Sequence, residues 1–241
     1  MPDAPAPPSS VPPEPTPSSP AGTASPPVAA DDARDHLRTI RSLMERATVY
    51  QTLSGPAALV GGVLASLVGF GILITSGVTF VWAPGDWTFI LVWLGVLLVC
   101  TALNLTLLAR ESRHRGDPFW SPGMRTALTA IAPPMITTGL LGLAVVHFER
   151  NLELCVLLWV AGYGLALLAA GHFAPRAIRL LGLAFVASAL ALTLFYHLSG
   201  GLGFWPNPVT RASLFMGSTF GLLHVLYGGL VLLRRRRHPA P

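Results

Sequence analysis

Long apolar runs alternate with short, arginine-bearing links over most of the chain. The first run, at 57–78, has twenty-two residues and no charged side chain. A helix of that length crosses the roughly 30 Å hydrocarbon core of a bilayer at about 1.5 Å per residue. Five similar runs follow, and the links leave no room for a second folded domain. We therefore predict an all-α, polytopic membrane bundle (56–233) with six transmembrane helices near 57–78, 88–109, 126–147, 153–173, 177–198 and 212–233.

The chain before the first span has two parts. Residues 1–30 hold eleven of the twenty-two prolines, mixed with alanine, serine and threonine, which is typical of a disordered tail. In 31–55, apolar and charged side chains instead recur at helical spacing, which predicts an amphipathic interfacial helix within 33–50. Its apolar face either lies on lipid or docks a partner protein. That face comprises Leu37, Ile40, Leu43 and Met44.

The arginines predict the orientation. All sixteen basic residues are arginine, and six spans place fourteen of them on one side of the membrane. The other side has only Arg150 and Arg211. Because basic loops stay on the cytoplasmic side, we expect both termini in the cytosol, with 234–241 as a basic tail.

Composition excludes a soluble class of protein. The chain is 52% hydrophobic and 11% charged, with a mean hydropathy of +0.58, whereas soluble domains have about 25% charged residues. The net charge of +5 does not indicate nucleic-acid binding, because the arginines flank apolar runs, where they set topology and contact anionic lipid.

Ionisable side chains are scarce inside the predicted spans. No Asp, Glu, Arg or Lys lies near a span centre, although ion-coupled carriers usually place one there. His224 does lie inside the sixth span, so we expect a hydrogen bond to it from Tyr163 in the fourth span or Asn104 in the second. A ligand-binding or proton-relay role is the alternative for His224.

Two prolines interrupt the third span. Pro133 and Pro134 lack amide donors and clash with the preceding turn, so we expect a kink or a broken helix. Broken helices line substrate sites in transporters. A transport path lined by Pro133, Pro134, Tyr163 and His224 is therefore an alternative function.

Motifs for catalysis or metal binding are missing. His147 and His197 have matching depth, beside Glu149 and Glu153, so a haem or metal site there is a weaker alternative. No zinc-spaced motif, Walker loop, GxSxG or kinase set supports an enzyme. We predict no enzymatic activity and no cofactor.

Small residues four apart indicate close helix packing. Gly61, Ala65 and Gly69 recur in the first span, and Gly217 and Gly221 in the sixth. We expect packing within the chain, with a homo-oligomer as the alternative.

Several stretches resemble an uncharacterised bacterial family of six-span integral membrane proteins. These are Ile40 to Arg46 with Tyr50, Leu53 to Pro56, Ala132-Pro133-Pro134, Gly171 to Arg176 and Thr219 to His224. The resemblance covers most of 36–233 and implies a bacterial inner membrane protein without assigned activity. Taken together, the sequence predicts a non-enzymatic structural or interaction protein of that membrane.

Overall fold

The computed structural model describes residues 34–40, 55–78, 83–116, 120, 122–171, 176–198 and 207–237. These residues form helices and contain no strand. The chain divides into two units, Met1–Arg41 and Ser42–Pro241. The predicted tail at 1–30 and most of the predicted interfacial helix, including Leu43 and Met44, lie outside the described residues.

In the first unit, residues 34–40 form a helix with every side chain exposed. Its polar side is held by Asp35, whose side chain accepts from Arg38 Nη1 at 3.1 Å and whose carbonyl oxygen accepts from Thr39 Oγ1 at 2.8 Å. Leu37 and Ile40 are 65% and 52% exposed. The predicted helix is thus confirmed over these seven residues, and its location at the membrane surface stays a prediction.

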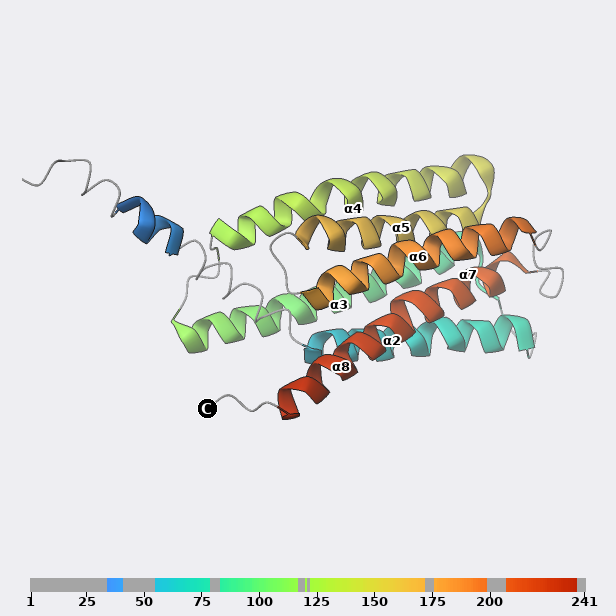
Figure 1. Cartoon of the computed structure of the whole chain (residues 1–241). Coiled ribbons are helices and arrows are strands. Elements are labelled where there is room, and N and C mark those ends of the chain that lie inside the picture. The colour runs from blue at the N-terminus through green and yellow to red at the C-terminus, as the bar shows by residue number, and fades with distance from the viewer. Residues whose placement is uncertain are drawn as a thin grey trace, which may run out of the picture. The chain divides into compact units, whose positions relative to one another are not determined.

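The second unit contains six helical segments long and apolar enough to cross a membrane, which confirms the predicted all-α, multi-pass architecture. The first span begins as an α-helix and ends in a π-helical turn, and a π-helical turn also interrupts the sixth span (Figure 1). In chain order the elements are α2 (Gly55–Leu73), η1 (Ile74–Val78), α3 (Asp86–Arg115), α4 (Pro122–Glu149), α5 (Leu152–Ala170), α6 (Arg176–Leu198), α7 (Pro208–Met216), η2 (Gly217–Leu223) and α8 (His224–Arg237).

Capping residues explain several helix ends. Asn151 precedes α5 and its side chain accepts from the Leu154 N–H at 2.9 Å, while Asn207 precedes α7 and accepts from the Val209 N–H at 3.0 Å. Gly116 follows α3 in the left-handed conformation, with φ at 70°, and the helix ends at Arg115, six residues beyond the predicted end of that span. Helix α8 likewise continues to Arg237, through arginines that the pattern assigned to a tail.

The third span is one continuous helix. Because α4 runs through Pro133 and Pro134, the broken-helix alternative is wrong, and a kink at the prolines stays a prediction. Proline has a helix-compatible φ, and a span can continue through it although the carbonyl oxygens four residues earlier, here those of Thr129 and Ala130, lose their amide donors. One turn later, the Thr138 hydroxyl donates to the Pro134 carbonyl oxygen at 2.7 Å.

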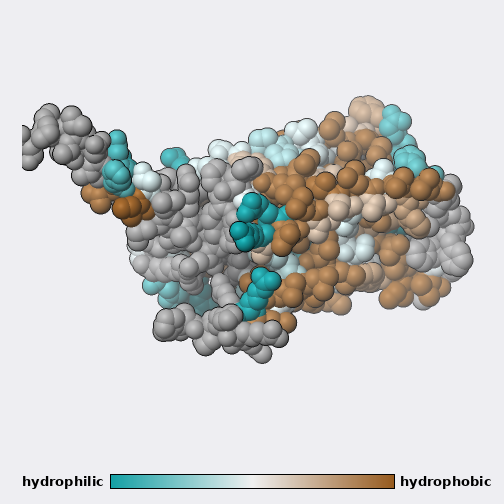
Figure 2. Space-filling view, in the orientation of Figure 1, coloured by the Kyte–Doolittle hydropathy of each residue, from teal (hydrophilic) through white to brown (hydrophobic). Residues whose placement is uncertain are grey.

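Helix α5 lies at the centre of the bundle, between α4 and α6 in Figure 1. Half of the residues in its most apolar stretch are buried inside the protein, whereas only 11% are buried in the most apolar stretches of α3 and α4. Outward-facing leucines cover the other spans, and Figure 2 shows this apolar surface along the bundle. The exposed surface is therefore of the kind that contacts lipid, as predicted.

Glycines bring the backbones of the first and sixth spans into contact. A Cβ atom on Gly62 would lie 2.6 Å from the Val225 backbone nitrogen, and one on Gly69 would lie 2.7 Å from the Gly217 Cα. The predicted packing within the chain is thus confirmed for Gly69 and Gly217. Gly61, by contrast, faces Cys100 of α3, and its neighbour Gly62 makes the contact instead.

Replacement of these glycines should destabilise the bundle. We expect Gly62→Ala or Gly69→Ala to lower the free energy of unfolding by about 1–3 kcal/mol, because backbone atoms cannot move aside as a flexible side chain can. Thermal unfolding in mild detergent would measure the loss. Gly71→Ala in the same helix is the matched control, since a Cβ there meets nothing within 4 Å and stability should hold. Equal effects at the three positions would contradict this packing.

Candidate functional site

The intramembrane histidine is paired as the sequence predicted. His224 Nε2 lies 2.8 Å from the hydroxyl oxygen of Tyr163, joining the start of α8 to α5. Its Nδ1 lies 2.9 Å from the carbonyl oxygen of Phe220, one turn earlier in the same span. Both ring nitrogens therefore have partners inside the protein, as an imidazole without access to water requires.

These partners fix the direction of each hydrogen bond in the neutral imidazole. A carbonyl oxygen only accepts, so Nδ1 carries the hydrogen and donates to Phe220. Nε2 of that tautomer has a free lone pair, and the Tyr163 hydroxyl donates to it. The arrangement uses the hydrogen-bonding capacity of both imidazole nitrogens and the hydroxyl hydrogen of Tyr163.

Aromatic rings surround this pair. Tyr163, Phe185, Phe220 and His224 come from three spans, and every pair of their ring centroids lies between 4.8 and 6.3 Å apart. Phe185 is fully buried. Tilted and edge-on contacts at these distances are favourable, so the polar pair lies inside an apolar shell.

A π-helical turn precedes the histidine. The backbone N–H of His224 donates to the Gly221 carbonyl oxygen, and the Phe220 oxygen accepts from the ring instead. Wider helical turns of this kind often occur at functional sites. Here the turn coincides with the position at which the sixth span places its imidazole against α5.

The other residues predicted for this site are not joined to it. Asn104 is half-buried on α3, and no hydrogen bond among the described residues connects it to His224. Pro133 is exposed on α4, and neither it nor Pro134 takes part in the ring cluster. These contacts do not test the four-residue transport path, which stays a prediction.

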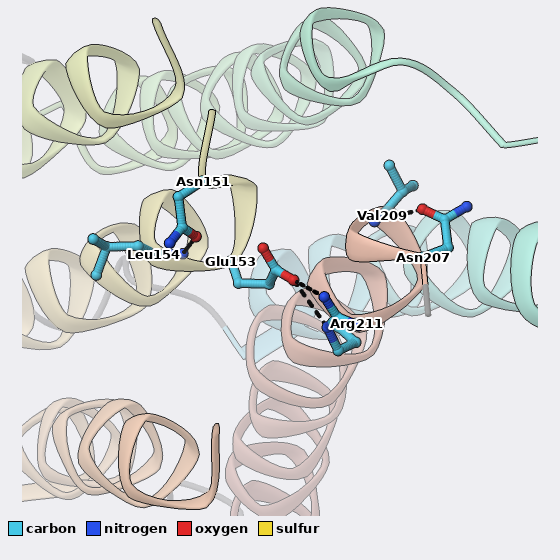
Figure 3. A network of polar contacts seen from close by, with 6 residues as sticks. All are labelled: Asn151, Glu153, Leu154, Asn207, Val209 and Arg211. Carbon is cyan, nitrogen blue, oxygen red and sulfur yellow. Dashed lines mark hydrogen bonds and ion pairs between the residues drawn. The ribbon is translucent and has the colours of Figure 1, made fainter. Parts of the chain in front are cut away.

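A second polar pair lies near the opposite end of α5 (Figure 3). Arg211 of α7 donates to Glu153 Oε1 from Nε at 2.9 Å and from Nη2 at 2.5 Å. The two side chains are only 13% and 5% exposed. Glu153 also lies in the first turn of α5, where the helix dipole favours a carboxylate. Because unpaired charges are very costly when buried, each side chain depends on the other.

Sequence reasoning considered both residues separately and missed this pair. Arg211 was considered only as one of the two arginines predicted on its side of the membrane. Glu153 was considered only as a residue beside a candidate metal site. The available signal was their matching depth, since each lies within one turn of the start of its span. An acid and a base at equal depth in antiparallel or parallel neighbours can pair, but the sequence does not say which helices are neighbours.

Hydroxyl groups form a third contact, between the first and sixth spans. The hydroxyl oxygens of Ser76 in η1 and Thr210 in α7 lie 3.0 Å apart, and Ser76 also donates to the Ile72 carbonyl oxygen at 2.6 Å. Both residues are buried. This contact joins the two spans at the end where Asn207 begins α7.

His147 and His197, which lie near the ends of α4 and α6, have aromatic neighbours. The ring of His147 lies 4.7 Å from Phe148 and 6.4 Å from Trp87, and His197 lies 5.4 Å from Tyr196. Among the described residues, no three His, Cys, Asp or Glu side chains gather as a metal site requires. Glu153, expected beside these histidines, is bound by Arg211 instead.

Comparison with known proteins gives no match to a family model, a curated protein or a solved structure. The resemblance noted in the sequence therefore stays a prediction. The candidate site rests on the geometry alone.

Breaking the buried ion pair should destabilise the protein strongly. Arg211→Met leaves the Glu153 carboxylate buried and unpaired, which should cost about 3–5 kcal/mol in the free energy of unfolding. The double variant Glu153→Leu with Arg211→Met should recover much of that loss. Unfolding in mixed detergent would measure both. Arg150→Met, at an exposed position, is the control and should stay near wild type; a similar loss there would contradict the pairing.

The Tyr163 hydroxyl should stabilise the imidazole. We expect Tyr163→Phe to cost about 1–3 kcal/mol, because the ring contacts remain while His224 Nε2 loses its partner. A double-mutant cycle with His224→Phe isolates the interaction. The double variant should lose less stability than the sum of the two single variants. Additive losses would show that the two groups do not interact.

Proposed function

We propose that the protein is a non-enzymatic, multi-pass membrane component with a structural or interaction role. The observation that supports this most is the pairing of a buried acid, a part-buried base and a part-buried imidazole with partners inside the protein. Glu153 accepts from Arg211, and His224 is bonded through both ring nitrogens. Side chains whose polar groups are paired in this way hold helices together. Few of their hydrogen-bonding groups remain to bind a substrate.

The setting we propose is the inner membrane of a bacterium, with both termini in the cytosol. The six spans and the distribution of arginines, fourteen against two, support this orientation under the positive-inside rule. In this setting the amphipathic segment 33–50 lies at the cytosolic surface.

The interaction role is assigned to that segment. Leu37 and Ile40 project on one side of the helix at 34–40, while Asp35, Arg38 and Thr39 bond with one another on the other side. An apolar stripe at this spacing fits a groove on a partner protein. The partner class is therefore a protein with an apolar groove near the membrane surface.

Recovery of a partner from the native membrane tests the proposal. The protein, tagged at the C-terminus, should retain a stoichiometric partner in mild detergent. Leu37→Ser with Ile40→Ser should remove that partner without changing the melting temperature. Arg38→Ser with Thr39→Ser on the polar side is the matched control and should keep it. A partner held equally by all three proteins, or no partner on the wild type, would contradict the docking role.

Small-solute transport is the second candidate, favoured by one observation. An imidazole inside a span, next to a π-helical turn, is a common feature of functional sites in membranes. Solute uptake by proteoliposomes would favour transport if His224→Ala abolished it at an equal amount of folded protein. Uptake unaffected by that substitution would remove His224 from any path.

A further inference from the structure

One end of the bundle carries exposed arginines on four different helices. They lie at the end of α3, the start of α4, the start of α6 and the end of α8, which consecutive up-and-down spans bring to the same side. No ion pair among the described residues involves them. The six are Arg110, Arg113, Arg125, Arg176, Arg179 and Arg234.

The opposite end has a different charge pattern. Its buried arginine, Arg211, is bound by Glu153, and its exposed Arg150 follows the exposed Glu149 directly. Among the described residues of the bundle, six exposed arginines therefore lie at the first end and one, Arg150, at the other. Water and salt ions alone can solvate exposed arginines. The side chains next to the arginines therefore determine whether this end of the bundle also binds another ligand.

On α6, Arg176 and Arg179 lie at the start of an exposed apolar stripe. Leu180 and Leu183 follow Arg176 at spacings of four and seven residues, on the same helical face, and are 65% and 54% exposed. Leu190 and Leu194 continue the face and are 68% and 59% exposed. Charge at one end and a continuous row of leucines below it match the two parts of a phospholipid.

The sixth span has the same arrangement in the reverse sequence order, with the leucines before the arginine. Arg234 follows Leu230 and Leu226 at four-residue steps, and both leucines are more than half exposed. The rings of Phe185 and Phe220 lie 5.2 Å apart, so α6 contacts the sixth span at η2. In Figure 2, hydrophilic residues stand at the edge of the brown apolar surface at one end of the bundle.

From these two arrangements we infer that this end of α6 and α8 binds anionic phospholipid, with phosphate groups at Arg176 and Arg179 on α6 and at Arg234 on α8. Guanidinium groups bind phosphate oxygens with paired hydrogen bonds, and juxtamembrane arginines favour acidic headgroups. The acyl chains lie along the leucine rows. A lipid with a neutral headgroup makes the same apolar contact and lacks the net charge.

Native mass spectrometry of the delipidated full-length protein tests this assignment. The probes are palmitoyl-oleoyl phosphatidylglycerol and the phosphatidylcholine with the same chains. We expect wild type to bind phosphatidylglycerol at least tenfold more tightly. Each substitution among Arg176→Gln, Arg179→Gln and Arg234→Gln should weaken that binding about fivefold, and phosphatidylcholine binding should not change.

Arg150→Gln, which removes one exposed arginine from the other end, should leave the preference intact. Equal binding of the two lipids by wild type would overturn the assignment, as would a triple variant that keeps the preference. Full displacement of the lipid by an equal concentration of soluble glycerol phosphate would also overturn it, because the leucine rows would then contribute nothing. Unchanged melting temperatures in phosphatidylcholine micelles show that the variants are folded.

Discussion

A polar group inside a bilayer gains from a partner within the protein, and among the described residues the sixth span takes part in three of the polar side-chain contacts between spans. Thr210 contacts Ser76 of the first span, Arg211 binds Glu153 of the fourth, and His224 binds Tyr163 of the fourth. These contacts lie at successive depths along one span. The sixth span is therefore bonded to its neighbours from one end to its interior, and its position determines the places of α2 and α5.

Close backbone contact is what allows the sixth span to hold this position. Gly62 and Gly69 of α2 leave no space beside Val225 and Gly217 for even a methyl group. Without a hydrophobic driving force between helices in lipid, such close packing is the main source of association. The π-helical turn lies within the same contact and ends at the histidine. Packing against α2 and hydrogen bonding to α5 thus meet at His224, whose Cβ would lie 2.8 Å from a Cβ on Gly62.

The sequence was sufficient for features that depend on one helix at a time. Apolar length placed all six spans within a few residues, and depth identified Tyr163 as a partner for His224. Features that depend on which helices are neighbours could be predicted less well from the sequence. A spacing of four indicated close packing, but it did not show that Gly61 faces α3 and Gly62 the sixth span. The prolines of α4 were expected to kink or break their helix, and α4 runs through both. The ion pair joins residues 58 positions apart, and nothing local marks them as neighbours.

The arginines show how the same side chain serves two roles at the two membrane surfaces. Arg211 is almost buried and its charge is neutralised by one carboxylate, so it fixes the relation between α5 and α7. The exposed arginines at the other end have no such partner among the described residues. A buried pair gains little from lipid charge, whereas exposed guanidinium groups gain directly from an anionic surface. Internal cohesion and membrane contact are therefore separated along the bundle, which is the arrangement expected of a rigid membrane component.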